Sequence, residues 1–398
     1  MTSTSWQRNL AINFAAELLA MMAFTFIDPL LPLYIQKVGD LTTKEAAFWS
    51  GIAASGLGVA MFFISPVWGV IADRYGRKSM VLRAMFGGAL VLLLMSFATN
   101  IYVIIVLRWI QGLVTGSVGA MTALASSTVP RNRMSFAMGI IMLAVFGGQS
   151  LGPLIGGFVA DRFGYQATFY LSGIFLVLGG TTVLLMVREQ FERPSQGQGA
   201  LLRGMWQLAK SRQMLIILVT LCLLSIAQSL VSPIISLRVK ELDPAGKAAT
   251  AAGLTFSLIG LGAAISSLVS GRLGERVSLP KMMVFSCFII GLLYLPPMWA
   301  GSVGLLTAFL ALTGLLRGGL STSSNAIVGL SVPQGQQGIA FGLSQSASSL
   351  GSGLGPLLGG SLATVVGLKP IFAVTAGVYM LAGLFAARWL LPHIPGKR

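Results

Sequence analysis

Apolar segments of membrane-spanning length follow one another along the whole chain, separated by short polar stretches. A helix needs about 20 apolar residues to cross about 30 Å of hydrocarbon. The pattern predicts twelve such helices in two sets of six, at residues 10–36, 50–71, 79–98, 101–122, 134–158, 167–187, 213–236, 249–271, 282–300, 303–327, 338–362 and 369–391. The predicted fold is therefore an all-α polytopic membrane protein. The first segment is too long for the core of a signal peptide, and no small-residue cleavage site follows it, so we expect it to remain as a span.

The composition agrees with this pattern. Charged residues make up 10% of the chain and apolar residues 55%, whereas soluble domains contain about 25% charged residues. The net charge of +16 would suggest a nucleic-acid partner in a soluble protein, but here most basic residues lie in the short loops. With the N-terminus inside, eighteen Lys and Arg residues fall on the cytoplasmic side and seven on the other. This bias predicts a multi-pass inner (plasma) membrane protein with both termini cytoplasmic and no nucleic-acid partner.

A motif rich in glycine and proline occurs twice. Residues Gly148–Gly157 return as Gly351–Gly360, at an offset of 351 − 148 = 203 residues. Glycine and proline weaken a helix by about 1 and about 3 kcal/mol, but in lipid small residues let neighbouring helices pack closely. Either copy alone could be only a packing seam. Together they indicate a duplicated bundle with two pseudo-symmetric halves, in which Gly355 and Pro356 repeat Gly152 and Pro153.

The boundary between the halves is predicted at a polar, flexible stretch. Residues 188–212 contain a Pro-Ser-Gln-Gly-Gln-Gly run, which is typical of a linker. This divides the chain into an N-terminal six-helix half at 1–187, a cytoplasmic linker at 188–212 and a C-terminal six-helix half at 213–398. Residues 201–208 could form a short helix on the inner membrane face; a plain tether is the alternative.

Few ionisable residues lie inside the predicted spans, namely Glu17, Asp28, Arg108 and Arg317. Each costs about 2.5–3.5 kcal/mol to insert, so each is a functional candidate. Glu17 and Asp28 are 11 residues apart, which on one helix places them within about 20° of the same face and about 16 Å apart. Met21 and Phe24 fall between them, so we expect a stripe that faces a cavity for an apolar, cationic molecule. The alternative for Glu17 is that it lies near the inner surface and is only solvated.

Asp28 and Arg108 are expected at the same depth. Pro29 and Pro32 follow Asp28, and prolines free helix carbonyl groups that must find partners or line water. A rearrangement that changed the separation of Asp28 and Arg108 would load or release a proton. We therefore assign Asp28, Arg108 and Glu17 to proton coupling. A purely structural ion pair between the first and fourth spans is the alternative.

The segment Gly69–Lys78 closes the second span. Gly76 permits a tight turn, and Asp73 beside several basic residues can hold charge-assisted bonds that break when helices separate. On physics alone it could be only a basic turn. Gly271–Arg276 echoes it in the second half, but Ser278, Leu279 and Pro280 replace the last three residues. We expect an asymmetric conformational gate formed by Gly69, Asp73, Arg74, Gly76 and Arg77.

These residues resemble the major facilitator superfamily, and within it the twelve-span drug:proton antiporters. Gly69–Lys78 is similar to the family's loop motif between spans two and three. Leu107–Gly112 with Gly116 resembles the fourth-span motif, and Gly147–Gly157 resembles the fifth-span motif of exporters. Asp28–Pro32 is similar to the first-span motif. A resemblance to the family's multidrug-resistance exporters rests on Trp49–Gly51, Ser65–Pro66 and Val129–Asn132.

The resemblance implies roles for individual residues. Asp73 and Arg77 would belong to a conformational latch, Arg108 to proton coupling, and Gly152 and Pro153 to the bend of span five between the halves. The two halves differ, however, in their intramembrane charges. An offset of 203 places Ala311 opposite Arg108, while Arg317 falls opposite Val114. Arg317 has no role in the family pattern; it could line the cavity, pair with carbonyl groups or repel cations.

The sequence and the resemblance together predict a secondary active transporter. It would export amphipathic drugs or similar small molecules in exchange for protons by alternating access, and so confer antibiotic resistance. The alternative is an exporter or facilitator of one endogenous metabolite, such as a sugar or a lipid precursor. An enzyme is not expected, because the only histidine, His393, lies in the C-terminal tail. We expect a monomer without cofactor or metal, and a substrate pocket formed by Phe24, Asp28, Trp109, Gln228, Asn325 and Gln345.

Overall fold

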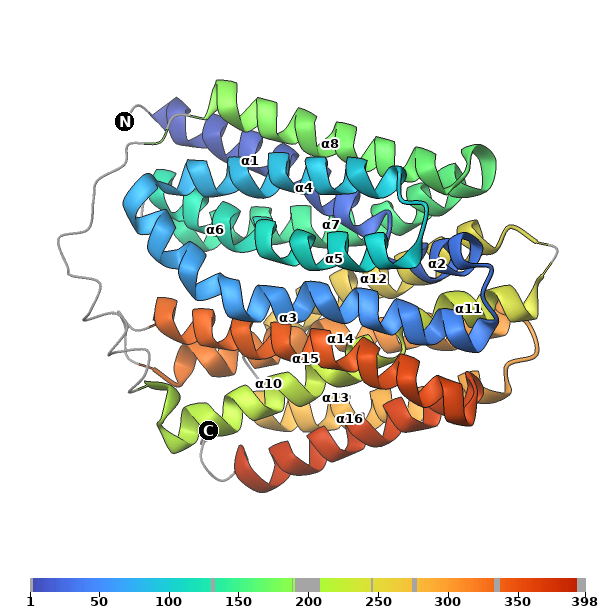
Figure 1. Cartoon of the computed structure of the whole chain (residues 1–398). Helices are drawn as coiled ribbons and strands as arrows, with labels where there is room; N and C mark the ends of the chain where they lie inside the picture. The colour runs from blue at the N-terminus through green and yellow to red at the C-terminus, as the bar shows by residue number, and fades with distance from the viewer. Residues whose placement is uncertain are drawn as a thin grey trace.

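The computed structural model describes residues 3–129, 133–187, 189, 208–244, 246–273, 278–332 and 337–391. Helices run nearly parallel to one another across the whole molecule (Figure 1). The N-terminal set consists of α1 (Ser3–Thr25), α2 (Leu31–Gly39), α3 (Thr43–Tyr75), α4 (Arg77–Ser96), α5 (Ile101–Val114), α6 (Ser117–Thr128), α7 (Met134–Phe163) and α8 (Tyr165–Met186). The C-terminal set consists of α10 (Arg212–Leu230), α11 (Ser232–Leu242), α12 (Ala248–Leu273), α13 (Leu279–Leu293), the short 3₁₀ helix η2 (Pro296–Trp299), α14 (Val303–Leu330), α15 (Gln337–Val366) and α16 (Lys369–Trp389).

Most of the expected spans are confirmed. Within the described residues, eleven helical segments are long and apolar enough to cross a membrane. They correspond to the predicted second to twelfth spans. The predicted first span is present as α1 and α2, but it is divided at residues 26–30 and carries Asn9, Asn13 and Glu17 on its longer piece. We call the end at which α1 begins and α16 ends the terminal end, and the opposite end the far end (Figure 1).

Several described spans are broken where the sequence weakens the helix, and three of the breaks lie at prolines or a glycine inside the bundle. The first bends between α1 and α2 around Pro29, and the seventh bends at Val231, just before Pro233 of α11. The fourth span breaks at Thr115 and Gly116, where Gly116 has a φ of 115° that favours glycine.

Side chains bind the carbonyl groups that the break in the fourth span frees. The Trp68 indole donates to the Leu113 carbonyl at 2.7 Å, and the Arg83 guanidinium donates to the Thr115 carbonyl at 3.3 Å. Arg83 also lies 3.7 Å from the centre of the Trp68 ring, a cation–π contact. Such partners make broken helices tolerable at membrane depth. By sequence position Arg83 is one of the eighteen basic residues predicted on the cytoplasmic side, but its side chain is engaged with the interior of the bundle.

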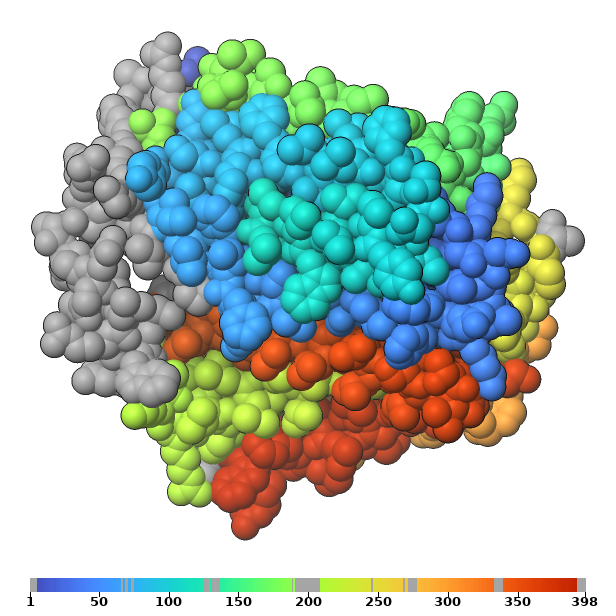
Figure 2. Space-filling view, viewed as in Figure 1, coloured from blue at the N-terminus to red at the C-terminus, as the bar shows by residue number. Residues whose placement is uncertain are grey.

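Two buried apolar clusters underlie the arrangement. One lies within α1–α8, and the other lies mainly within α10–α16 with a few residues from α2, α3 and α7. The two sets meet along α3 against α15 and along α7 against α12. Figure 2 shows α3 and α15 side by side along one face of the molecule. The predicted division at 188–212 stays a prediction, since most of this stretch lies outside the described residues.

The repeated motifs pack in the same way in both sets. The Thr25 hydroxyl lies 2.7 Å from the Met21 carbonyl and 3.0 Å from the Gly148 carbonyl. In the second set the Ser229 hydroxyl lies 2.6 Å from the Ser225 carbonyl and 3.4 Å from the Gly351 carbonyl. Each hydroxyl therefore joins the end of the first helix of its set to the glycine-rich helix.

The glycines and prolines of the motifs face different neighbours. A Cβ at Gly152 would come within 2.9 Å of the Met22 carbonyl oxygen in the same set, and one at Gly355 would come within 2.7 Å of the Ile226 carbonyl oxygen. Pro153 and Pro356, one residue later, present their carbonyl groups to the other set, against Gly253 of α12 and Gly51 of α3. Each motif thus packs within its own set and across the boundary at once.

The contacts between the sets gather toward the far end. Among the described residues, the hydrogen bonds across the boundary include Lys240 to Gln36 at 2.9 Å, Thr250 to Asp161 at 2.7 Å and Ser150 to the Ser257 carbonyl at 3.2 Å. Nearer the terminal end, the repeat-related Gly139 and Gly342 have no neighbouring atom within 4 Å of the place of a Cβ. The hydrogen bonds that join the described parts of the two sets thus lie between the middle of the helices and the far end, and they hold the far end closed.

Candidate functional site

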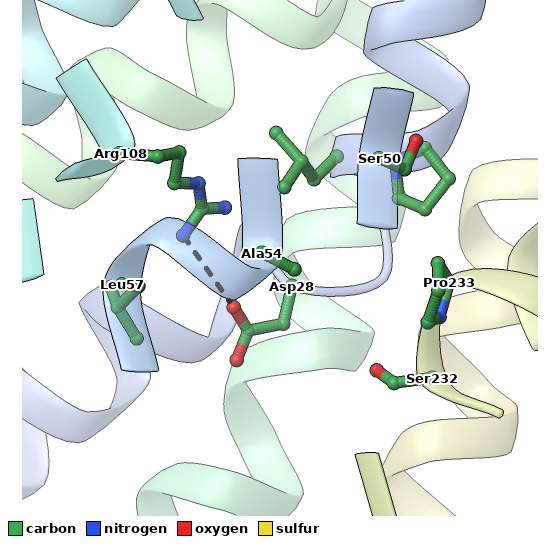
Figure 3. A pocket seen from close by; sticks show the side chains of 9 residues that line it. Asp28, Ser50, Ala54, Leu57, Arg108, Ser232 and Pro233 are labelled. Carbon is green, nitrogen blue, oxygen red and sulfur yellow. Dashed lines mark ion pairs between the residues drawn. The ribbon is translucent and has the colours of Figure 1, made fainter. Parts of the chain in front are cut away.

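A small cavity lies between the two sets beside the break in the first span. Residues from α2, α3, α5 and α11 line it together with Asp28, and they are Leu31, Pro32, Ser50, Ala54, Leu57, Arg108, Ser232 and Pro233. Figure 3 shows Asp28 directed into this space toward Arg108, with Ser232 and Pro233 on the opposite side. The cavity offers about 70 Å³ to the centres of water-sized molecules, and about 10–15 Å³ is enough for one water. Several waters therefore fit beside Asp28.

The repeat places matching residues on both sides of the cavity. Asp28-Pro29 and Ser232-Pro233 occupy equivalent positions, at an offset of 232 − 28 = 204 residues. Each pair stands where the first helix of its set is broken. The cavity is therefore bordered by the same element from both sets, but only the N-terminal set supplies a titratable group there.

The charged pair of the cavity consists of Asp28 and Arg108. A distance of 3.9 Å separates an Asp28 carboxylate oxygen from Arg108 Nη1, and the two side chains are 55% and 4% exposed. Arg108 Nη1 also donates to the Gln111 side chain at 3.2 Å, while its Nε and Nη2 are buried without a hydrogen-bond partner. The carboxylate thus meets both the open cavity and a buried cation. This arrangement can exchange a proton with water on one side and lose or gain its counter-charge on the other.

Glu17 is not placed as the sequence pattern indicated. We expected Glu17, Met21, Phe24 and Asp28 on one cavity-facing helix face, but α1 ends at Thr25 and the chain turns before Asp28. Glu17 is fully buried, and both its carboxylate oxygens lack a hydrogen-bond partner. Ser117, at the start of α6, approaches the carboxylate without meeting hydrogen-bond geometry. Neither the shared face nor the solvated alternative is correct, and a coupling role for Glu17 stays a prediction.

The other expected pocket residues are dispersed. Phe24 is half-buried and packs over Gly88 of α4, and Trp109 packs its indole on Gly56 of α3 while remaining 41% exposed. Neither lines the cavity beside Asp28.

The polar pocket candidates also fall at separate places. Gln228 is half-buried and accepts a hydrogen bond from Arg317 at 3.1 Å. Asn325 and Gln345 are exposed on α14 and α15, and Gln345 donates weakly to Ser349 at 3.5 Å. Of the six predicted pocket residues, only Asp28 lines the described cavity, while Gln228 contacts Arg317, an intramembrane charge of its own C-terminal set.

The predicted gate is only partly described. Gly69, Asp73 and Arg74 lie in the last turns of α3, and their side chains lie outside the described residues. Gly76 has a φ of 90° and forms the turn into α4, as expected. The Glu189 carboxylate then accepts from the backbone N–H groups of Arg77 and Lys78 at 2.9 Å each. The start of α4 is thus capped by an acid that follows α8, a partner the sequence analysis did not identify.

The cavity residue that sequence reasoning missed most clearly is Ser232. The signal was available, because the repeat offset places Ser232-Pro233 opposite Asp28-Pro29. Ser50 of α3 was also missed; it is fully buried, its hydroxyl lacks a partner, and no local pattern distinguishes it from other span serines.

The described structure consists of two similar sets of helices around a central charged pair. A comparison of the sequence with protein-family models identifies the family to which the chain belongs. The family model described as Major Facilitator Superfamily matches residues 14–261 and 223–398. The chain belongs to the major facilitator superfamily. Members of this superfamily are transporters, so this multi-pass membrane protein is a transporter of a small-molecule substrate.

Curated relatives of this superfamily cover nearly the whole chain. "Multidrug resistance protein MdtG" of Serratia proteamaculans is 32% identical over 395 residues, which are 99% of this chain and 96% of the relative. The protein of the same name from Escherichia coli O17:K52:H18 is 31% identical over 389 residues, which are 97% and 95%. The expected resemblance to multidrug-resistance exporters is therefore confirmed.

Solved structures of the superfamily share the fold. A bacterial homologue of the human lysosomal transporter Spinster, in an inward-facing and occupied conformation, matches with a TM-score of 0.81 at 13% identity and covers 100% of both chains. The human organic anion transporter MFSD10 (TETRAN) matches with a TM-score of 0.73 at 19% identity, covering 96% of this chain and 99% of its own. At these identities the likeness concerns the fold alone.

Proposed function

We propose that this transporter exports amphipathic drugs or similar small molecules in exchange for protons. The observation that carries the proposal is the Asp28–Arg108 pair, at 3.9 Å, in a cavity between the two sets of helices that has room for several waters. An acid with access to water and a buried counter-charge is suited to exchange a proton when the surroundings change. The relatives named multidrug resistance proteins support drugs as the substrate class.

The orientation follows from charge. By sequence position, eighteen basic residues are assigned to the same side as the N-terminus and seven to the other side, so we place the terminal end in the cytoplasm of an inner membrane. The closed far end then faces outward, and the described conformation opens toward the cytoplasm. Two six-helix halves that rock about the cavity would open it alternately to each side.

A cycle can be built from the pair and this orientation. In the conformation open to the cytoplasm, Asp28 releases its proton through the cavity and the resulting carboxylate pairs with Arg108. Substrate binds in the same conformation. When the far end opens, a proton from outside binds to Asp28, the attraction to Arg108 weakens, and substrate leaves. The proton gradient favours this direction, because protons enter from the side on which they are more concentrated.

The test uses purified protein in sealed vesicles with an imposed pH difference and a fluorescent amphipathic dye. Wild type should move dye against its gradient, and Asp28→Asn should reduce this movement at least about tenfold, because the amide cannot carry a proton and general acid–base roles contribute about 10²–10⁴-fold. The matched control is Asp40→Asn, an exposed acid in the turn after α2. Unchanged dye movement in Asp28→Asn, or equal movement without any pH difference or voltage, contradicts the proposal.

The same vesicles test the alternative of one endogenous metabolite. Uptake or export of a sugar or lipid precursor that does not depend on the pH difference, together with no dye movement, would support a facilitator instead. The membrane orientation is tested separately by labelling single cysteines at Lys44 and Lys281 from outside intact cells: only the Lys44→Cys protein should react.

A further inference from the structure

Arg317 is an intramembrane cation without an acidic partner in its own set. It lies near the middle of α14, at position 15 of 28. The only acids in residues 213–398 lie at the ends of predicted spans, and they are Glu241, Asp243 and Glu275. Because a guanidinium stays charged in proteins, its charge must be balanced by something other than a carboxylate of the C-terminal set.

The groups around Arg317 are mainly hydrogen-bond donors. Its Nη2 donates to Gln228 Oε1 at 3.1 Å, which leaves the Gln228 amide N–H groups as donors beside it. The Tyr379 hydroxyl lies within electrostatic reach of the guanidinium, and its ring stacks on that of Tyr294 at 5.6 Å. Both tyrosine hydroxyls are buried without a hydrogen-bond partner. A guanidinium, an amide and two phenol groups together offer many donors and few acceptors, which suits an anion.

Arg317 and Gln228 lie on helices that pack mainly on other neighbours. α10, which carries Gln228, packs mainly on α15 and α16, whereas α14, which carries Arg317, packs mainly on α12 and α13. The hydrogen bond between Arg317 and Gln228 therefore joins α14 and α10, two helices that do not pack mainly on each other. Arg317 is also only half-buried, so its neighbours do not enclose the residue completely.

The geometry points to an anion-binding subsite in the C-terminal set, where Arg317 and Gln228 bind the carboxylate, phosphonate or sulfonate group of an amphipathic substrate. This inference rests on the proposed export function and specifies its substrate class. A planar guanidinium binds such groups through two parallel hydrogen bonds, and it repels cationic substrates at the same place. The cationic substrate expected from the acidic residues of the first span is therefore not the class we assign.

The two charges of the cycle would then be bound in different sets. A proton binds to Asp28 of the N-terminal set and the anion binds to Arg317 of the C-terminal set, so they do not compete for one group. An inside-negative membrane potential also favours both movements, the entry of a proton and the exit of an anion. Anion binding at equilibrium should therefore survive the loss of the proton site.

Equilibrium binding with three matched dansyl probes tests the subsite. Dansylglycine carries a carboxylate, dansylglycinamide is neutral, and dansylethylenediamine carries an amine, on the same ring system. Binding to purified protein in nanodiscs is followed by probe fluorescence, without any gradient. Wild type should bind dansylglycine roughly 10- to 100-fold more tightly than the amide, as one charge-assisted contact predicts. It should bind the amine most weakly.

The variants separate the subsite from general effects on folding. Arg317→Gln should remove the preference for dansylglycine while the affinity for the amide stays within about threefold of wild type. Arg317→Lys keeps the charge without the planar fork and should retain part of the preference. Arg162→Gln, which removes an exposed cation at the end of α7, is the control and should bind all three probes as wild type does.

Three results would overturn the subsite: no preference for the carboxylate in wild type, a preference for the amine, or a preference that persists in Arg317→Gln. Asp28→Asn distinguishes this failure from failure of the proposed function. That variant should keep the dansylglycine preference and lose proton-driven transport. If Asp28→Asn keeps both the dansylglycine preference and proton-driven transport, proton coupling at Asp28 is wrong and the subsite is still supported. If wild type shows no preference for dansylglycine but Asp28→Asn loses proton-driven transport, only the subsite is wrong.

Discussion

Replacing Gly253 with alanine should open the far end of the transporter. An added Cβ there would collide with the Pro153 carbonyl group across the boundary, with the carbonyl carbon only 2.9 Å away and the Leu154 Cα 3.4 Å away. These atoms belong to the backbone of the other set, so no flexible side chain can move aside. The helices α7 and α12 must therefore separate by about half an ångström or more, since ordinary contacts begin near 3.4 Å.

The size of the effect follows from the cost of overpacking. Inserting a methyl group into a tight contact costs about 1–3 kcal/mol, which shifts a two-state equilibrium about 5- to 150-fold. The cost applies only while the sets are in contact at this point, so the population should move away from the conformation with a closed far end. The repeat supplies a second position, because Gly51 faces the Pro356 carbonyl group in the same way. Gly51→Ala should act in the same direction.

Distances between spin labels at the far end measure this shift. Labels at Lys44→Cys and Lys247→Cys, exposed residues of the two sets, are introduced after replacing Cys222 and Cys287 by alanine. Gly253→Ala should lengthen the main distance or increase a longer population. The control is Gly342→Ala, a helix glycine with no neighbouring atom within 4 Å, so both variants gain the same helix propensity. An unchanged distribution in Gly253→Ala, or an equal change in Gly342→Ala, would refute this account of the boundary.

The remaining predictions concern packing within the N-terminal set. Gly152→Leu should lower the yield of folded protein or abolish transport, because its side chain would meet Thr25 and the backbone of Met22; normal transport by a normally folded variant would show that α1 and α7 separate there. Glu189→Gln should lower stability by about 1 kcal/mol in a thermal melt, since the carboxylate caps the N–H groups that begin α4; an equal melting temperature would mean that this cap is not formed.

The partnership of Asp28 and Arg108 could be predicted because span topology sets the depth of each residue. Counting residues from the ends of the first and fourth spans placed both at one level, and the structure separates them by 3.9 Å. Counting residues along the helix gave a wrong result for Glu17 and Asp28, which it placed on one helix face. It assumed one continuous helix, whereas the chain turns between Thr25 and Leu31. Proline indicates that a helix will bend, but the direction of the bend depends on the helices that pack around it.

The pocket residues show a second limit. Trp109 and Arg108 are neighbours in sequence, yet Arg108 is buried beside Asp28 and Trp109 packs on Gly56 and is partly exposed. Nearly every position of a membrane span is apolar, so hydropathy carries little information about which face turns inward. Rotation of each helix is set by close contacts between small residues, and these depend on partners distant in the chain.

By itself, the sequence determined most of the spans, their duplication, the family and the shared depth of Asp28 and Arg108, because these depend on local composition and on position along a helix. Tertiary structure alone decided which charges meet. It buried Glu17 away from the cavity, placed Ser232 opposite Asp28, and set Arg317 beside Gln228. The physical reason is that the rotation and bending of a helix minimise the energy of packing against neighbours, and those neighbours come from the whole chain.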